Sequence, residues 1–158
     1  TFRSVARTFA GVAHRLELIR EIHGVKYIND SIASSPTRAI AGLRSFKPTD
    51  RLILIVGGHD KHVPFDELGD EICRRCKALF ICGETADAIS AAVRNSQHYT
   101  PDFPMFVNAD WRENVLAASR FAEAGDTVLL SPACSSFDFF KNFAQRGDLF
   151  REIVMGLT

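Results

Sequence analysis

The sequence lacks the features that would assign it to a membrane, a secretion pathway or a nucleic acid. It has no apolar run long enough to cross a bilayer and no signal-peptide pattern. Lysine plus arginine and aspartate plus glutamate balance at 19 each, so no global basic field favours a nucleic acid or a membrane surface as partner. We therefore expect a cytoplasmic protein with no nucleic-acid and no membrane partner.

The cysteine and histidine spacings do not form a complete metal-binding pattern. Cys73 and Cys76 form a CxxC on a segment expected to be helical, but no second pair stands at zinc-finger spacing. His59 and His62 lie three residues apart in a loop beside Lys61, and the sequence shows no acidic or histidine partner for them. We expect reduced, partly buried cysteines and no metal site, with zinc, redox or other metal chemistry as a minor alternative.

Three motifs with a known nucleotide-binding or nucleophilic role are also absent. There is no GxxxxGK[ST] phosphate loop, no GxGxxG follows a strand, and Ser131 is followed by proline rather than by a nucleophile elbow. The chain begins at Thr1 without an initiator methionine, and we expect it to be a fragment of a larger protein. The residues alone thus predict a domain without a nucleotide fingerprint of its own.

The sequence does contain alternating strand and helix patterns. The run RLILIV at residues 51–56 is almost continuously apolar, which is typical of a parallel strand covered on both faces. Further strand patterns lie at residues 14–22, 25–28, 78–82, 104–107 and 127–130, and helix patterns at 36–46, 65–75, 84–93, 109–122 and 137–157. This order predicts an α/β fold: a Rossmann-like, mostly parallel sheet with helices on both faces and an antiparallel N-terminal hairpin at one edge.

Three predicted strands end in polar clusters, which are Asn29-Asp30-Ser31, Gly57-Gly58-His59-Asp60-Lys61, and Ser131 with Ser135-Ser136. In a parallel sheet these ends lie at one edge, where the ligands of open α/β sheets bind. Lys61 supplies a cation for a carboxylate or phosphate, and Ser34 and Ser136 supply hydroxyl donors. Turn glycines and capping serines are the more usual explanation of any one cluster, but three clusters at one edge favour an anion-binding site.

Phenylalanines crowd the segment after the third cluster, at Phe137, Phe139, Phe140 and Phe143. If the segment is helical, Phe139 and Phe143 share one face, and Phe137 and Phe140 share another. We expect the cluster to lie mainly in the core, with one face left to wall a cleft or to contact another domain.

Four stretches, taken in order, resemble the C-terminal domain of the Mur ligase family. They are GVAHRLE, YINDSIASSP, ILIVGGHDK and LLSPACSSFDFFKNFAQRGDLF, and together they extend over nearly the whole chain. The run from Asp30 to Pro36 favours the branch that adds D-glutamate. The resemblance implies that residues 14–158 form this domain and that residues 1–13 are a linker or the tail of a preceding central ATPase domain.

The resemblance implies an ATP-dependent amide ligase of peptidoglycan precursor synthesis, serving cell wall biogenesis, cell shape and cell division. The carboxylate of UDP-MurNAc-L-alanine would be activated as an acyl phosphate and attacked by the amine of D-glutamate. ATP and Mg²⁺ would be bound mainly by the central domain, and the chain would contact its own central and N-terminal domains within a monomer. The fragment alone, with no catalytic residue, is expected to be inactive. The alternatives are another Mur- or folylpolyglutamate-type ligase and a non-enzymatic anion-binding α/β module.

The resemblance also implies a D-glutamate site within this chain. Lys61 and Ser34 would contact one carboxylate of D-glutamate, and Ser136, Phe137 and chiefly Phe143 would contact the other. Ser34 stands where threonine is common in the family, which keeps the hydroxyl.

A second set of residues is implied to face the nucleotide. Arg15 would lie near its phosphates and Asp30 near its ribose, with Asn29 beside them. Ile32 stands where the family usually has lysine, so the resemblance predicts one cation fewer near the nucleotide.

Overall fold

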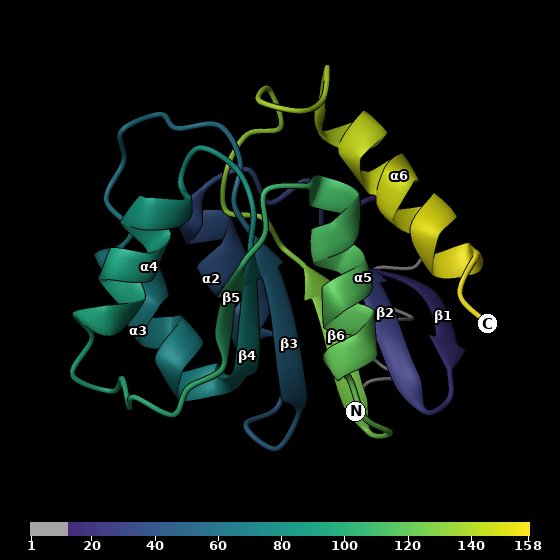
Figure 1. The fold of residues 1–158 in the computed structure, drawn as a ribbon, viewed down its shortest axis with the longest axis horizontal. Helices are drawn as coiled ribbons and strands as arrows, with labels where there is room; N and C mark the ends of the chain where they lie inside the picture. Colours follow the sequence, from purple (N-terminus) through teal and green to yellow (C-terminus); the bar gives the residue numbers. More distant parts are fainter. Residues whose placement is uncertain (1–12) are drawn as a thin grey trace.

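The computed structural model describes residues 13–158, and Figure 1 shows their fold. The strands are β1 (Glu17–Ile22), β2 (Val25–Asn29), β3 (Arg51–Val56), β4 (Cys76–Ile81), β5 (Met105–Val107) and β6 (Asp126–Leu130). The helices are α2 (Pro36–Arg44), α3 (Asp66–Arg75), α4 (Ala86–Arg94), α5 (Trp111–Phe121) and α6 (Phe143–Met155). The predicted boundary at residues 1–13 falls almost wholly outside the described residues and stays a prediction.

One six-stranded sheet, with the order β1-β2-β6-β3-β4-β5, forms the centre of the fold. β1 pairs with β2 in antiparallel fashion, and every other neighbouring pair is parallel. His23 and Gly24 join β1 to β2 with φ values of 53° and 79°, the left-handed conformations that a tight hairpin turn requires. The predicted mostly parallel sheet with an antiparallel N-terminal hairpin is confirmed.

Helices cover both faces of the sheet, with α2, α3 and α4 on one side and α5 and α6 on the other (Figure 1). Side chains alternate along β3: Leu52 and Leu54 belong to the core under α2 to α4, and Ile53 and Ile55 to the core under α5 and α6. This alternation explains the continuous apolar run, since each face is buried. No helix within residues 13–158 is both long and apolar enough to cross a membrane.

The carboxyl ends of β2, β6 and β3 lie side by side, as expected from the sequence. Backbone hydrogen bonds join the segments that follow these strands: Asp30 N–H to the Leu130 carbonyl at 2.7 Å, Ala133 N–H to Ala33 at 2.9 Å, Gly57 N–H to Pro132 at 2.9 Å and His59 N–H to Ser135 at 2.9 Å. The three polar clusters therefore form one continuous edge whose backbone is fixed.

The prediction for the last helix is wrong at its start, because α6 begins at Phe143 and not at Phe137. Asn142 is the N-cap, with an extended backbone, and its side-chain oxygen accepts a hydrogen bond from the Gln145 N–H at 2.8 Å. Residues 137–142 form turns and bends instead. Gly147 lies inside α6 and does not break it.

The expectation that the phenylalanine cluster lies mainly in the core is also wrong. Phe137, Phe139 and Phe143 are 64%, 47% and 37% exposed. Only Phe140 of the four packs against the core, with its ring edge-on to Trp111 at a centroid distance of 5.1 Å. Because the segment is not helical before Phe143, the predicted pairs of shared faces do not form.

The CxxC pair spans a junction between elements and does not lie on one helix. Cys73 is in α3, whereas Cys76 has an extended backbone and opens β4. All four cysteines are free, and burial raises the pKa of each thiol, which keeps the thiols protonated and unreactive.

Candidate ligand-binding site

A buried arginine that the sequence analysis missed holds two loops of the carboxyl edge together. Arg146 of α6 is 1% exposed. Its Nη1 donates to the carbonyl oxygen of Cys134 at 2.8 Å, and its Nη2 donates to the carbonyl oxygen of Ser31 at 2.7 Å. Its Nε donates to the Ser31 hydroxyl at 3.0 Å. Burial lowers the pKa of Arg146 to about 10, so the guanidinium stays charged at neutral pH.

Ser34 and Ser136, both predicted to contact a carboxylate, lie on the two loops that Arg146 joins. Nη2 of Arg146 donates to the half-buried Ser34 hydroxyl at 3.4 Å, which leaves the Ser34 O–H proton able to donate outward. Ser136 is buried, and its carbonyl accepts the N–H of Phe140 at 2.8 Å, which fixes the start of the turn. The two hydroxyls are therefore carried by segments whose backbones are held in place.

Lys61 is exposed and makes no hydrogen bond or ion pair with any other described residue. Its loop is fastened by Glu84, whose carboxylate accepts the Asp60 N–H at 3.2 Å and lies 2.7 Å from Nδ1 of His59. Glu84 is thus an acidic partner for His59 that the sequence analysis did not see. In the part of the chain that the structure describes, no three His, Cys, Asp or Glu side chains are grouped to hold a metal ion.

Phe137 and Phe143, both predicted to contact D-glutamate, face different surroundings. The carbonyl of Phe143 accepts the Ser31 hydroxyl at 2.7 Å, and its ring lies edge-on to His14 at 5.9 Å. Phe137 instead lines a cleft of about 590 Å³ together with Phe139, His59 and Asp138 among others. The structure therefore places Phe143 beside Ser31, and Phe137 beside the loop that carries Lys61.

Asp30 is a buried carboxylate at the end of β2, with an exposed fraction of 4%. Its Oδ2 accepts the Ser131 hydroxyl at 2.9 Å, and its Oδ1 accepts the Leu16 N–H at 3.2 Å. Burial raises the pKa of Asp30 to about 6, and these two hydrogen bonds and the charges of Arg15 and Arg38 oppose the rise.

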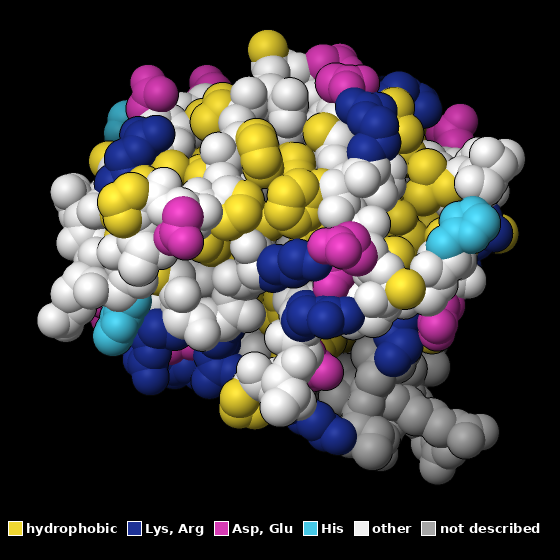
Figure 2. Space-filling model, turned by 60° about the horizontal axis from the view of Figure 1, so that its bottom comes forward, with side chains coloured by type: hydrophobic (Ala, Val, Ile, Leu, Met, Phe, Trp, Pro, Cys, Tyr) yellow, Lys and Arg dark blue, Asp and Glu magenta, His cyan; other side chains and the backbone are white. Residues whose placement is uncertain are grey.

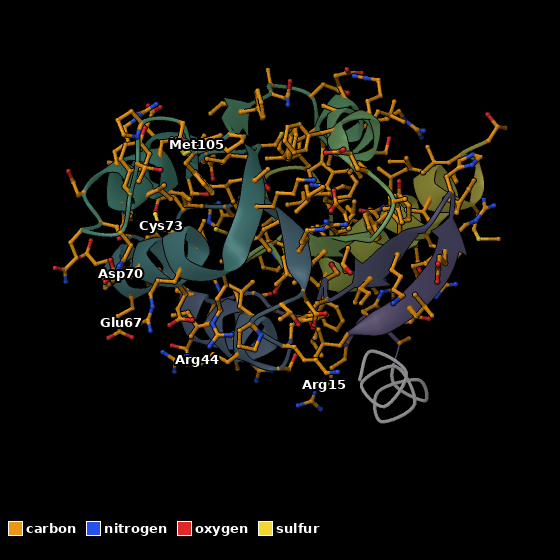
Figure 3. The ribbon with its side chains drawn as sticks, turned by 90° about the horizontal axis from the view of Figure 1, so that it is seen from below. Arg15, Arg44, Glu67, Asp70, Cys73 and Met105 are labelled. Carbon is orange, nitrogen blue, oxygen red and sulfur yellow. The ribbon has the colours of Figure 1, made fainter. Side chains whose placement is uncertain are left out.

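A cavity of about 170 Å³ is lined by both Asp30 and Arg15, and their predicted contact with a nucleotide stays a prediction. Its other lining residues are Leu16, Ile32, Ala33, Arg38, Ala41, Gly42 and Ser45. Figure 3 shows Arg15 on the side of the sheet that α2 covers, with its side chain pointing away from the strands.

Asn29, the third residue predicted to face the nucleotide, is fully buried. Its Nδ2 lies 3.0 Å from Nδ1 of His14 and donates to Glu17 at 3.4 Å, and its Oδ1 accepts the Ser31 N–H at 3.0 Å. These bonds fix the turn that carries Asp30 and Ser31. Its predicted contact with a nucleotide stays a prediction.

The opposite edge of the sheet carries charges that are paired within the fold. Lys77 Nζ lies 2.7 Å from Asp126 and 3.1 Å from Glu123, and Arg51 Nε lies 3.0 Å from Asp126. Figure 2, which brings this end of the molecule forward, shows Lys and Arg side chains interspersed with Asp and Glu beside a hydrophobic area. In contrast, Arg15 and Lys61 at the carboxyl edge have no ion-pair partner among residues 13–158.

Comparison with solved structures shows that the fold of this chain occurs in larger proteins. E. coli FolC in complex with ADP matches with a TM-score of 0.61 at 17% identity, over 91% of this chain and 32% of that chain. The murein peptide ligase of Psychrobacter arcticus matches with a TM-score of 0.60 at 18% identity, over 87% of this chain and 30% of that chain.

Curated relatives are much closer in sequence. The UDP-N-acetylmuramoylalanine--D-glutamate ligase of Acetivibrio thermocellus is 53% identical over 155 residues, which cover 96% of this chain and 33% of the relative. The protein of the same name from Clostridium perfringens is 48% identical over 98% of this chain and 33% of its own length. This chain thus spans about a third of the length of these relatives. Residues 14–134 match the family described as "Mur ligase, glutamate ligase domain", and the chain belongs to that family.

Proposed function

We propose that this chain is the amino-acid-binding C-terminal domain of an ATP-dependent ligase that adds D-glutamate to UDP-MurNAc-L-alanine in peptidoglycan precursor synthesis. The observation that carries the proposal is 53% identity, over 96% of this chain, to a ligase named for that reaction. The positions of Ser34, Ser136 and Lys61 on the loops of one sheet edge support it. The parent protein would be a cytoplasmic monomer in which this domain contacts the central and N-terminal domains.

The reaction joins a carboxylate to an amine through an acyl phosphate. A carboxylate oxygen of UDP-MurNAc-L-alanine attacks the γ-phosphorus of ATP, and ADP leaves. The amine of D-glutamate then attacks the acyl carbon, inorganic phosphate leaves, and the nitrogen loses a proton as the amide forms. ATP supplies the free energy, and this chain holds the amine near the acyl carbon, which raises its effective concentration.

D-Glutamate has two carboxylates, so its site must supply donors at both ends. Lys61 and the Ser34 hydroxyl would bind one carboxylate, and Ser136 and Phe143 would bind the other end. Hydrogen bonds from a charged donor are the stronger kind, and Lys61 has no competing partner in the described part of the chain. Arg146 adds a fixed positive charge next to Ser34, which favours an anion there.

The nucleotide would contact the neighbouring part of the same edge. Arg15 is exposed and could contact a phosphate, and Asp30, which lines the same cavity, has oxygens suited to a ribose hydroxyl. Among the described residues no three His, Cys, Asp or Glu side chains are grouped to hold a metal ion. The Mg²⁺ that accompanies ATP would be bound mainly by the central domain of the parent protein.

Phosphate release from ATP by the full-length parent tests the proposal, with UDP-MurNAc-L-alanine and either D- or L-glutamate present. We expect release with D-glutamate and none with L-glutamate. Release only with a different amino acid would show that the parent is a ligase of this family that adds that amino acid instead of D-glutamate. No release with any amino acid would contradict the ligase function and leave an anion-binding α/β module. The 158-residue chain alone should not turn over ATP.

A further inference from the structure

One face of α2 forms a wall of the cavity over Asp30. Arg38, Gly42 and Ser45 line the cavity and recur at the spacing of a single helix face. Gly42 lies directly against the carboxylate, because a Cβ at this position would be 2.9 Å from Asp30 Oδ2. Arg38 lies one turn earlier on the same face and lines the same cavity as Asp30 and Arg15.

The two arginines are the cationic side chains of this cavity, since the remaining lining residues are apolar or small apart from Asp30 and Ser45. Both arginine side chains are exposed, and neither guanidinium makes a hydrogen bond or an ion pair with another residue in the range 13–158. Their charges are felt at Asp30, since both oppose the rise in the pKa of its carboxyl group. The cavity thus combines two unpaired cations with one buried acceptor, which suits a ligand that carries both anionic groups and hydroxyls.

Arg38 contributes little to the stability of its own helix. It lies in the first turn of α2, where the helix dipole disfavours a positive charge, and that turn contains no acidic residue. The helix is capped without it, because the Ser35 hydroxyl accepts the backbone N–H of Arg38 at 3.3 Å. Its side chain is therefore free to serve a ligand.

The cavity is smaller than a complete small-molecule site, which measures about 300–1,000 Å³. Its volume of about 170 Å³ leaves room for only part of a nucleotide. We propose that Arg38 is a second cationic contact for the phosphate chain of the nucleotide, in addition to Arg15. This proposal rests on the proposed nucleotide contact of the edge and adds a residue from α2 that the sequence analysis did not assign.

Nucleotide binding by the full-length parent tests the role of Arg38. The probes are a non-hydrolysable ATP analogue and adenosine, compared in the unsubstituted protein, Arg38→Ala, Arg38→Lys and a control. Arg112→Ala is the matched control, since Arg112 lies in the first turn of α5, is exposed and has no partner among the described residues, but is on the other face of the sheet. Circular dichroism shows whether each variant is folded.

We expect Arg38→Ala to weaken binding of the ATP analogue about tenfold and to raise the KM for ATP to a similar extent, because a charge-assisted hydrogen bond is lost. Arg38→Lys should recover part of the affinity, Arg112→Ala should bind like the unsubstituted protein, and adenosine binding should not change. Equal affinity of Arg38→Ala and Arg112→Ala for the ATP analogue would overturn the proposal. So would a finding that Arg38→Ala weakens adenosine binding as much as it weakens binding of the ATP analogue.

The two proposals fail in different ways. If the unsubstituted parent binds the ATP analogue but releases no phosphate with any amino acid, the proposed ligase function is wrong. The comparison of Arg38→Ala with Arg112→Ala in nucleotide binding then still decides the role of Arg38. If the parent ligates D-glutamate but Arg38→Ala keeps the KM for ATP, the Arg38 proposal alone is wrong. A parent that binds no ATP analogue overturns both.

Discussion

The Nη2 atom of Arg146 donates a hydrogen bond to the carbonyl oxygen of Ser31 across 115 residues of sequence, at 2.7 Å. The same guanidinium donates from Nη1 to the carbonyl of Cys134. One side chain from α6 thus fastens the loop after β2 to the loop after β6, and carbonyl dipoles rather than a carboxylate stabilise its charge. Because carbonyl groups carry no net charge, they do not neutralise the positive charge of Arg146. The residue can therefore both hold the two loops together and attract an anion to the site.

Replacing Arg146 by alanine should destabilise the 158-residue chain by about 3 kcal/mol, because buried carbonyl oxygens lose their donors and a cavity forms. Arg146→Lys should be intermediate, since lysine keeps the charge but cannot form the planar fork. Urea denaturation measures both changes. Arg94→Ala is the control, because Arg94 is exposed and unpaired within residues 13–158, and it should stay within about 0.5 kcal/mol of the unsubstituted chain. If Arg146→Ala lowers the free energy of unfolding no more than Arg94→Ala does, Arg146 does not stabilise the fold by joining the two loops.

Gly147→Ala should destabilise the chain by about 1–3 kcal/mol although alanine is the better helix former by about 1 kcal/mol. A Cβ on residue 147 would lie 2.1 Å from Nδ1 of His14, so the imidazole would have to leave its place beside Asn29. The destabilisation from this overlap should exceed the gain in helix propensity. Thermal or urea denaturation shows whether Gly147→Ala lowers or raises the stability of the chain.

A double-mutant cycle separates the overlap from other effects of Gly147→Ala. In a His14→Ala background the imidazole is gone, and Gly147→Ala should lose most of its destabilising effect. The Nδ2 of Asn29, 3.0 Å from the added Cβ, is the close contact that remains. The same loss in both backgrounds would show that His14 is not the obstacle.

Hydrophobic pattern was sufficient to predict the architecture, since the apolar run at 51–56 can be buried only between two helical layers. The polar ends of β2, β3 and β6 converge because parallel strands share a direction, and this follows from sequence alone. Arg146 could not be found this way, because arginine is usually exposed and its partners here are backbone groups distant in the chain.

The start of α6 was predictable but was missed. Asparagine is among the residues most strongly preferred at the N-cap, so Asn142 indicates a helix that begins at Phe143. The phenylalanines before it predict a helical cluster that lies mainly in the core, with one face left for a cleft or another domain. In the structure Phe140 packs against the core, but Phe137 and Phe139 are largely exposed, which a hydrophobic pattern cannot distinguish from burial.

Lys61→Ala should impair the use of D-glutamate by the full-length parent without unfolding it. The Lys61 side chain is exposed and makes no contact that stabilises the described fold, so the free energy of unfolding should change by less than about 0.5 kcal/mol. Loss of a charge-assisted hydrogen bond to a carboxylate should raise the KM for D-glutamate about tenfold or more. Steady-state kinetics measure this, with the exposed Lys47→Ala as control. Equal KM values for the two variants would remove Lys61 from the site.

Asp30 should make the chain less stable as the pH rises from about 4 to about 6. Its pKa is about 6 in the folded chain and about 3.9 in an unfolded one, so in this window the folded state holds a proton that the unfolded state has lost. Stability falls with pH wherever the folded state binds more protons, and a shift of about two pKa units corresponds to about 3 kcal/mol. A buried carboxylate that weakens the fold at neutral pH is consistent with a binding role, where its charge has a use.

Asp30→Asn tests this directly, because an amide keeps the shape of the carboxylate and remains uncharged. Its oxygen can accept the Leu16 N–H, and its Nδ2 can donate to the Ser131 hydroxyl. We expect the variant to match the unsubstituted chain near pH 4 and to exceed it by about 2–3 kcal/mol at pH 7. Urea denaturation of both chains from pH 4 to pH 8 gives the difference between them. The half-buried Asp138, whose pKa is also raised, is present in both chains, so its contribution cancels. A difference that stays constant with pH would mean that Asp30 does not titrate in this window.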